Sequence, residues 1–160
     1  MSALTNRRMI ILTDGHSNPI TAKTACSVLR YCQNEVLAVL DVAAVGQTAE
    51  QLLGAGGKIP VIDNLDAAPE AKTLLIGIAP PGGKIPAHWR PIIISAITRG
   101  LNVVSGLHEF LVDDPEFAAA AGTAGTELID VRRNDEHDVA NRDGLRSDCL
   151  RILTVGQDCC

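Results

Sequence analysis

The chain has 160 residues, which favours one ordinary α/β domain with a short appendage over two complete domains. Its net charge is −5, its aromatic content is 2%, and no basic stripe is present, so the composition excludes a dedicated nucleic-acid-binding protein. The longest wholly apolar stretches, such as 9–12 and 36–40, are far too short to cross a bilayer. We therefore expect a cytoplasmic protein that binds small molecules or other proteins, with no nucleic acid and no membrane as a partner.

The hydrophobic content and the cysteines narrow the class further. Hydrophobic residues make up 46% of the chain and the mean hydropathy is +0.16, values typical of strands covered on both faces by helices. The five cysteines show no CxxC spacing, so no zinc site or other metal site is expected.

Short strand patterns alternate with helical patterns along the chain. The expected strands are residues 9–12, 36–40, 59–62, 74–79, 101–104 and 127–131. The expected helices are residues 21–32, 47–53, 89–99 and 114–121. Gly54 is expected to end the second of these, and Pro115 is expected in the first turn of the last. This alternation predicts a Rossmann-like, doubly wound, mainly parallel sheet of about six strands in a three-layer α/β domain over residues 1–131.

The end of the chain differs in composition from the residues before it. Residues 132–150 are dense in charge and predict a polar linker, after which residues 151–160 resume with an apolar strand. The strand runs into Gly156 and Asp158, so we interpret it as the first strand and the start of a truncated P-loop domain, in which these two residues contact a phosphate. The pattern resembles the first half of the G-x-D-x-x-V-G-K-T loop of dethiobiotin synthetase-like proteins. The alternative is a frayed terminal strand.

The first candidate site follows the first strand. Gly15, Lys23 and Thr24 fall in the loop and helix start that end at the carboxyl side of that strand, where open α/β sheets bind ligands, and they predict an anion or cofactor site. The alternative is a turn in which Thr21 caps the helix. Asp41 stands where a ribose-binding carboxylate is expected, but without a G-x-G-x-x-G fingerprint it is better interpreted as a turn former.

Two later loops complete the candidate site. Gly82 and Gly83 bring backbone N–H groups close to a ligand or to another domain, with Lys84 adding charge, unless the loop is only a rigid turn. His108 follows the fifth strand and is the best candidate for a general acid or base, because histidine exchanges protons near neutral pH. Asp113 and Asp114 resemble a carboxylate pair but are better interpreted as residues that cap the following helix.

Several motifs together resemble one known family. The most specific are Gly-Ile-Ala-Pro at 77–80 and Ser-Gly-Leu-His at 105–108, and weaker matches cover nearly the whole chain. The family is bacterial and archaeal, is classed as a domain of unknown function, and joins a Rossmann-like N-terminal domain to a C-terminal P-loop domain. Its members include D-glutamate N-acetyltransferases, so the resemblance implies acetyl-CoA or a nucleotide as cofactor and a D-amino acid as acceptor.

The resemblance also implies partners. The chain ends before a P-loop lysine, so we expect an N-terminal domain that lacks its P-loop partner, is inactive alone and forms a homo-oligomer. One alternative is a non-catalytic ligand-binding or oligomerisation module of a P-loop NTPase-like protein. The other is an NAD(P)-dependent oxidoreductase, which the missing glycine fingerprint disfavours.

Overall fold

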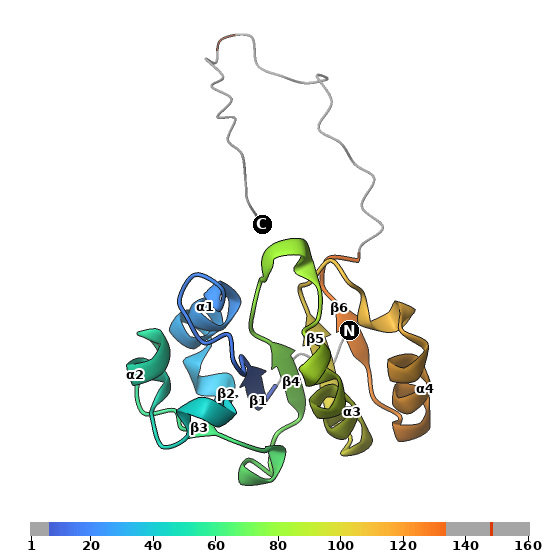
Figure 1. Ribbon diagram of the computed structural model, residues 1–160, viewed down its shortest axis with the longest axis horizontal. Helices are drawn as coiled ribbons and strands as arrows, with labels where there is room; N and C mark the ends of the chain where they lie inside the picture. Colours follow the sequence, from blue (N-terminus) through green and yellow to red (C-terminus); the bar gives the residue numbers. More distant parts are fainter. Residues whose placement is uncertain (1–6, 134–147, 149–160) are drawn as a thin grey trace.

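The protein is built on a six-stranded sheet in which every strand pair is parallel, as the computed structural model shows for residues 7–133 and Asp148, the residues it describes. The strands are β1 (Met9–Leu12), β2 (Val36–Leu40), β3 (Val61–Ile62), β4 (Thr73–Ile76), β5 (Asn102–Ser105) and β6 (Leu128–Asp130). Their order in space is β3-β2-β1-β4-β5-β6 (Figure 1). This order confirms the predicted Rossmann-like, doubly wound sheet.

The α-helices and 3₁₀ turns connect these strands. The α-helices are α1 (Lys23–Tyr31), α2 (Ala49–Leu53), α3 (Arg90–Thr98) and α4 (Pro115–Ala124). The 3₁₀ turns are η1 (Gln33–Glu35), η2 (Val42–Ala44), η3 (Leu65–Ala67), η4 (Pro81–Gly83), η5 (Ala87–Trp89) and η6 (Leu111–Asp113). Among the described residues, the link from β3 to β4 therefore contains only a 3₁₀ turn where the other links contain an α-helix.

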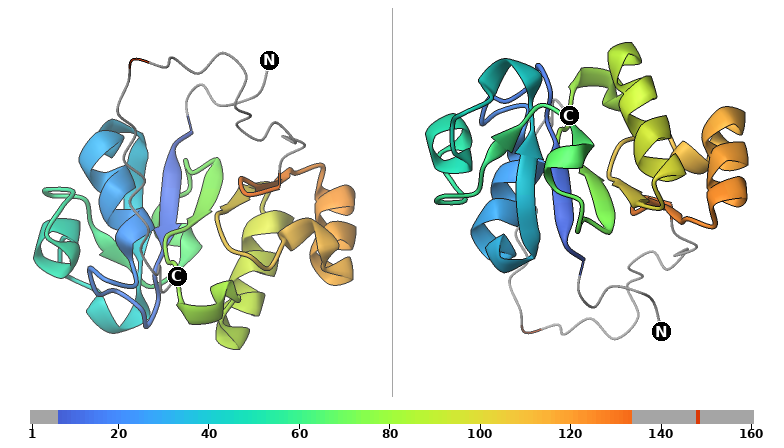
Figure 2. Two further views of the ribbon diagram at one scale, coloured as in Figure 1. Left: turned by 90° about the horizontal axis from the view of Figure 1, so that it is seen from above. Right: turned by 90° about the horizontal axis from the view of Figure 1, so that it is seen from below.

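The sheet is the middle of three layers. The Cys26 thiol of α1 contacts the Leu53 carbonyl of α2 at 3.6 Å, and Arg90 of α3 is ion-paired with Asp114 at the start of α4, so each pair of helices packs together. Figures 1 and 2 show the α1–α2 pair on one face of the sheet and the α3–α4 pair on the other. The three-layer prediction is confirmed.

The central strands are apolar because both of their faces are covered. All four residues of β1 and of β4 are buried, and Ile10 pairs with Ala38 of β2 on one side and with Leu74 of β4 on the other. Continuous apolar runs of this kind are typical of parallel strands beneath two helical layers. This burial fixes β1 and β4 at the centre of the sheet.

The start of α1 corrects one expectation. The helix begins at Lys23 instead of residue 21, and its N-cap is Ala22, with no capping side chain. Thr21 does not cap the helix, because its backbone N–H donates to Asn18 Oδ1 at 2.9 Å and its hydroxyl accepts from Asn18 Nδ2 at 3.1 Å. The loop therefore uses the Thr21 side chain to close itself.

The other helix ends follow the expected signals. Asp114 caps α4 by accepting from the N–H groups of Glu116 and Phe117, with Pro115 in the first turn, as predicted. Gly54 ends α2 in the left-handed conformation, also as predicted. The helix itself starts at Ala49 and not at residue 47, because Thr48 is its cap and forms a capping box with Gln51.

Some expectations lie outside the described residues. These are most of the polar linker, the strand at 152–155, and the proposed phosphate ligands Gly156 and Asp158. Within residues 7–133, no helix is long and apolar enough to span a membrane.

Candidate active site

The strand order creates a topological switch point between β1 and β4, because the chain winds outward from these strands in opposite directions. Loops that leave the carboxyl ends of the strands gather at one edge of the sheet, which we call the carboxyl edge. Gly15 lies in the loop after β1, Gly82 and Gly83 in the loop after β4, and His108 in the loop after β5. The structure thus places all of these predicted residues on the same edge.

The backbone closes part of the crevice at the switch point. The Ala25 N–H in the first turn of α1 donates to the Gly77 carbonyl at 2.9 Å, and the Ala79 N–H donates to the Thr21 carbonyl at 2.8 Å. Gly77 allows this approach, since a Cβ there would lie 2.5 Å from Ile11 Cγ2. The Ala25 N–H in the first turn of the helix is therefore engaged by the chain itself and is not open to a phosphate, while Lys23 and Thr24 precede it at the helix start.

The loop after β1 is anchored through Asp14. Its Oδ1 accepts from the Val42 N–H at 2.9 Å, and its carbonyl accepts from Trp89 Nε1 at 3.0 Å. His88 Nε2 lies 3.8 Å from Asp14 Oδ2, and the His16 and His88 rings are nearly parallel with centroids 6.1 Å apart. No group of three or more potential metal ligands is arranged to hold an ion here or elsewhere in the described part of the chain.

Asp41 is a structural residue. It is buried, its Oδ1 accepts from the Ala43 N–H at 3.0 Å, and its Oδ2 accepts from the Ser17 hydroxyl. Ser17 in turn contacts the Thr13 hydroxyl at 2.8 Å. With both carboxylate oxygens engaged inside the protein, the turn-forming interpretation is supported over a ribose contact.

Gly82 and Gly83, the two glycines in the loop after β4, have different structural roles. Gly82 is exposed with φ +79°, and a Cβ there would meet nothing within 4 Å. Gly83 is buried with φ +60°, and a Cβ there would overlap the His108 ring at Cδ2. The Gly83 carbonyl accepts from the N–H groups of His108 and Glu109, each at 3.1 Å. Gly83 thus packs against the His108 ring and fixes the backbone of its loop, while the backbone at Gly82 is exposed to solvent.

His108 is exposed and lines two hollows at the carboxyl edge. The larger, which we call the acidic hollow, has a volume of about 370 Å³ and is lined by Ile85, His108, Glu109, Phe110, Asp113, Asp114 and Pro115. The second, which we call the arginine hollow, holds about 20 Å³ and is lined by Ala79, Pro80, Gly83, Gly106, Leu107, His108 and Arg132. His108 therefore lines both a hollow that contains three carboxylates and a smaller one that contains an arginine.

Most carboxylates of the acidic hollow have fixed partners. Arg90 binds both oxygens of Asp114 at 2.7 Å, and this guanidinium holds the pKa of the Asp114 carboxyl below its usual range. Asp113 is paired with Arg133 at 2.7 Å. Glu109 accepts from the Ile85 N–H at 2.7 Å and, among residues 7–133, forms no ion pair. Glu109 is therefore the carboxylate best placed to meet a cationic group.

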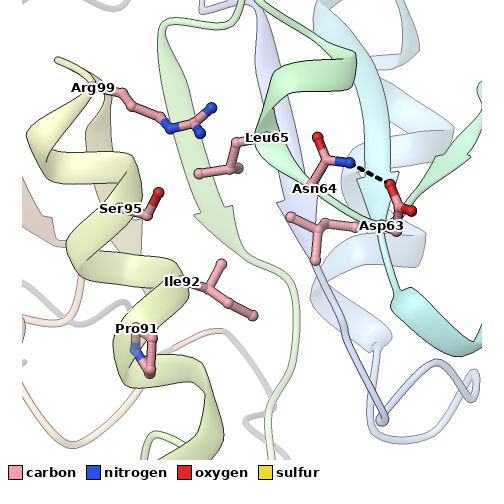
Figure 3. Close-up of a pocket in the computed structure, with 8 residues that line it drawn as sticks. Asp63, Asn64, Leu65, Pro91, Ile92, Ser95 and Arg99 are labelled. Atoms are coloured by element: carbon pink, nitrogen blue, oxygen red, sulfur yellow. Dashed lines mark hydrogen bonds between the residues drawn. The ribbon is translucent and has the colours of Figure 1, made fainter.

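A third hollow lies away from these residues, on the face of the sheet that α3 covers. This groove, which we call the α3 groove, has a volume of about 220 Å³ and is lined by Leu40, Asp63, Asn64, Leu65, Pro91, Ile92, Ser95 and Arg99. Figure 3 shows Ile92 and Ser95 on α3 facing Leu65 across it. Its one cation, Arg99, is bound to both oxygens of Asp66. The groove exists because η3 is too short to fill the space that a crossover helix would occupy.

The sequence singles out His108 as a candidate, but not three of the charged residues that line the hollows beside it. Glu109 and Arg132 were not singled out, and Asp113 was interpreted only as a capping residue. The sequence does show that Glu109 is next to His108 and that Arg132 follows the sixth strand. It does not show that these residues lie close together in space, because that depends on how the loops after β4, β5 and β6 fold against one another.

Comparisons with known proteins bear on this site. A family profile described as a domain of unknown function, DUF1611_N, Rossmann-like domain, matches residues 42–134. A D-glutamate N-acetyltransferase of Tritonibacter scottomollicae is 39% identical over 120 residues, which are 72% of this chain and 35% of that protein. Another, from a Pseudoalteromonas species, is 39% identical over 89 residues, 56% of this chain and 26% of that protein. The chain thus spans about a third of the length of the curated relatives it matches.

A solved structure gives the same result for the fold. The crystal structure of a DUF1611 family protein from Anabaena variabilis superposes with a TM-score of 0.74 at 32% identity. The match covers 85% of this chain and 40% of that one.

Proposed function

Because the chain belongs to the DUF1611_N family of Rossmann-like domains, we propose that it is the acceptor-binding part of an N-acetyltransferase that acetylates an acidic D-amino acid such as D-glutamate. The observation that carries the proposal is that His108 lines both the acidic hollow and the arginine hollow. Two relatives named D-glutamate N-acetyltransferase supply the reaction class. A P-loop domain elsewhere in the complete protein, formed in part by Gly156 and Asp158, remains part of the proposal.

The charges of the two hollows suit an amino acid. An ammonium group placed in the acidic hollow would meet the Glu109 carboxylate. A carboxylate of the same molecule, too large to enter the 20 Å³ arginine hollow, would meet the exposed Arg132 beside it. Charge-assisted hydrogen bonds of this kind are stronger than neutral ones and fix orientation. The arrangement therefore favours a compound that carries both charges.

His108 supplies the proton transfer that the reaction needs. An ammonium has no lone pair, so it must lose a proton before its nitrogen can form a bond to carbon, and a neutral imidazole accepts that proton near neutral pH. When bound, acetyl-CoA would supply a thioester: the C–N bond would form at its carbonyl carbon as the C–S bond breaks, and the leaving thiolate would take up the second proton that the nitrogen loses, which gives free CoA thiol. Gly83 and the paired N–H bonds of residues 108 and 109 hold the imidazole in place throughout.

The donor is placed beside the Gly82–Gly83 loop. Lys84 is exposed there, and its positive charge complements the phosphates that acetyl-CoA and nucleotides share. The oxidoreductase alternative is less favoured, because the Ala25 N–H in the first turn of α1 donates to the Gly77 carbonyl and is not open to a dinucleotide phosphate.

The test is an acetyl-transfer assay on the protein expressed from its complete reading frame. Release of free CoA thiol is measured with D-glutamate, with L-glutamate and with no acceptor, in the presence and absence of ATP. The proposal expects D-glutamate-dependent thiol release, and equal rates with and without acceptor would contradict it. A requirement for ATP would assign the phosphate site to a nucleotide.

Substitutions then test the two hollows. Glu109→Gln keeps an oxygen for the Ile85 N–H but removes the charge, and we expect the KM for D-glutamate to rise about tenfold while the fold is unchanged. Arg132→Gln is expected to act in the same direction. Arg99→Gln, which changes an arginine of the α3 groove, is the matched control and should leave KM unchanged.

A further inference from the structure

Exposed apolar side chains are distributed very unequally over the surface of the protein. The large hydrophobic residues that are exposed in the described part of the chain are Ile20, Val42, Val45, Val112, Val131 and Tyr31. All except Tyr31 lie in loops that leave the carboxyl ends of strands, and Tyr31 ends α1 at the opposite edge. Single exposed apolar residues are ordinary, but their concentration on one edge is typical of an interaction surface.

The exposed residues flank the candidate site on both sides. Ile20, Val42 and Val45 belong to the loops after β1 and β2, whereas Val112 and Val131 belong to the loops after β5 and β6. The loops that carry His108 and the Gly82–Gly83 pair lie between them in the sheet order. A protein domain that covered both groups would also cover the acidic hollow, where His108 is exposed to solvent.

We propose that a further domain of the same polypeptide docks on the carboxyl edge through Ile20, Val42, Val45, Val112 and Val131. The curated relatives and the solved relative are about two and a half to four times as long as the matched region, since the match covers 35%, 26% and 40% of their chains. Such relatives carry enough additional chain to form a second domain, and the edge that is apolar is also the edge that holds the site. The inference rests on family membership and on the surface, and it stands whether or not the reaction is acetyl transfer.

Docking at this edge has a chemical consequence. Excluding water from a site strengthens the charge contacts inside it and protects a reactive donor from hydrolysis. The additional domain would therefore form a second wall of the acidic hollow and close it to water.

Hydroxyl-radical footprinting of the complete protein tests the proposal without any substitution. Ile20 and Tyr31 are each 85% exposed in this structure, so they form a matched pair. With each rate corrected for the intrinsic reactivity of its side chain, Ile20 and Val131 are expected to be protected several-fold, and Tyr31 is not. Equal labelling of Ile20 and Tyr31 would overturn the proposal. Protection that appears only at protein concentrations where sedimentation shows self-association would also overturn it, because the occupant would then be a second copy.

A pair of variants gives a second readout. Ile20→Glu places a charge in the proposed contact, and we expect it to lower the melting temperature of the complete protein by about 4 °C or more. Tyr31→Glu makes the same change on the opposite edge and is expected to shift it by less than half as much. Equal shifts would contradict the docking surface.

Discussion

Gly83 is the residue on which the position of His108 depends most directly. A Cβ at Gly83 overlaps the imidazole, whereas a Cβ at Gly82 meets nothing, although both residues have positive φ. Gly83→Ala and Gly82→Ala therefore share the backbone strain and differ in the clash. We expect Gly83→Ala to displace the His108 ring and to lose most acetyl transfer, with Gly82→Ala largely active. The imidazole signals in NMR spectra check the displacement, and unchanged signals in Gly83→Ala would contradict it.

Asp114 makes two separable contributions. It caps α4 through two backbone N–H groups and it pairs with Arg90. Asp114→Ala removes both and should lower the free energy of unfolding by about 1 kcal/mol from the cap alone. Asp114→Asn retains a capping oxygen and should cost less. Denaturant unfolding of the parent and both variants at pH 7 measures the difference, and equal losses would show that the cap contributes nothing.

The same pair predicts a pH dependence. Arg90 keeps the pKa of the Asp114 carboxyl below its usual range, so the pair stabilises the fold above the ordinary pKa of an aspartate and is lost as the pH falls through the lowered one. The stability gap between the parent and Asp114→Asn is therefore expected to be full at pH 7 and to close in acid. A gap that widened as the pH fell would contradict the pairing.

Individual residues were predictable where the signal is local. The cap at Asp114 and the stop at Gly54 follow from residue type and position alone, and the structure confirms both. Thr21 shows the limit, because Asn18 competes for its hydroxyl and its N–H within the same loop. The contact between Gly83 and His108 joins two loops and has no local signature.

Among the elements, α1 and β4 approach one another most closely at Gly77. A Cβ there would lie 2.5 Å from Ile11 Cγ2 and 3.1 Å from Ala25 Cβ, although the backbone conformation itself is ordinary. We expect Gly77→Ala to lower the free energy of unfolding by about 1–3 kcal/mol through overpacking. Gly122→Ala on the exposed face of α4, where a Cβ meets nothing, should raise it by about 0.5–1 kcal/mol. Equilibrium unfolding measures both changes. If both variants changed the free energy of unfolding in the same direction, the result would contradict this explanation.

The positions of the elements were largely readable from the sequence, and their ends less so. The six strands all appear near their predicted ranges, because buried parallel strands give continuous apolar runs. The 3₁₀ turns were not predicted, since three residues carry no periodicity. The α3 groove was also not foreseen, because it results from the absence of a helix between β3 and β4 within the described residues.

At the scale of the whole molecule, topology turns separate loops into one site. The doubly wound order brings the ends of β1, β4, β5 and β6 to a common edge, which is why residues as distant as Gly15 and Arg132 lie on the same rim. The sequence was enough to place the candidate residues on that edge. The charges that surround His108, and the apolar residues that flank it, required the folded loops.

The most direct test of the central claim is kcat/KM for D-glutamate in the complete protein, its His108→Gln variant and its His88→Gln variant. His88 is an exposed imidazole at the same edge that lines neither hollow. We predict that His108→Gln lowers kcat/KM by about 10²-fold or more, while His88→Gln keeps the parental rate. A parental rate in His108→Gln would contradict the assignment of His108 as the base.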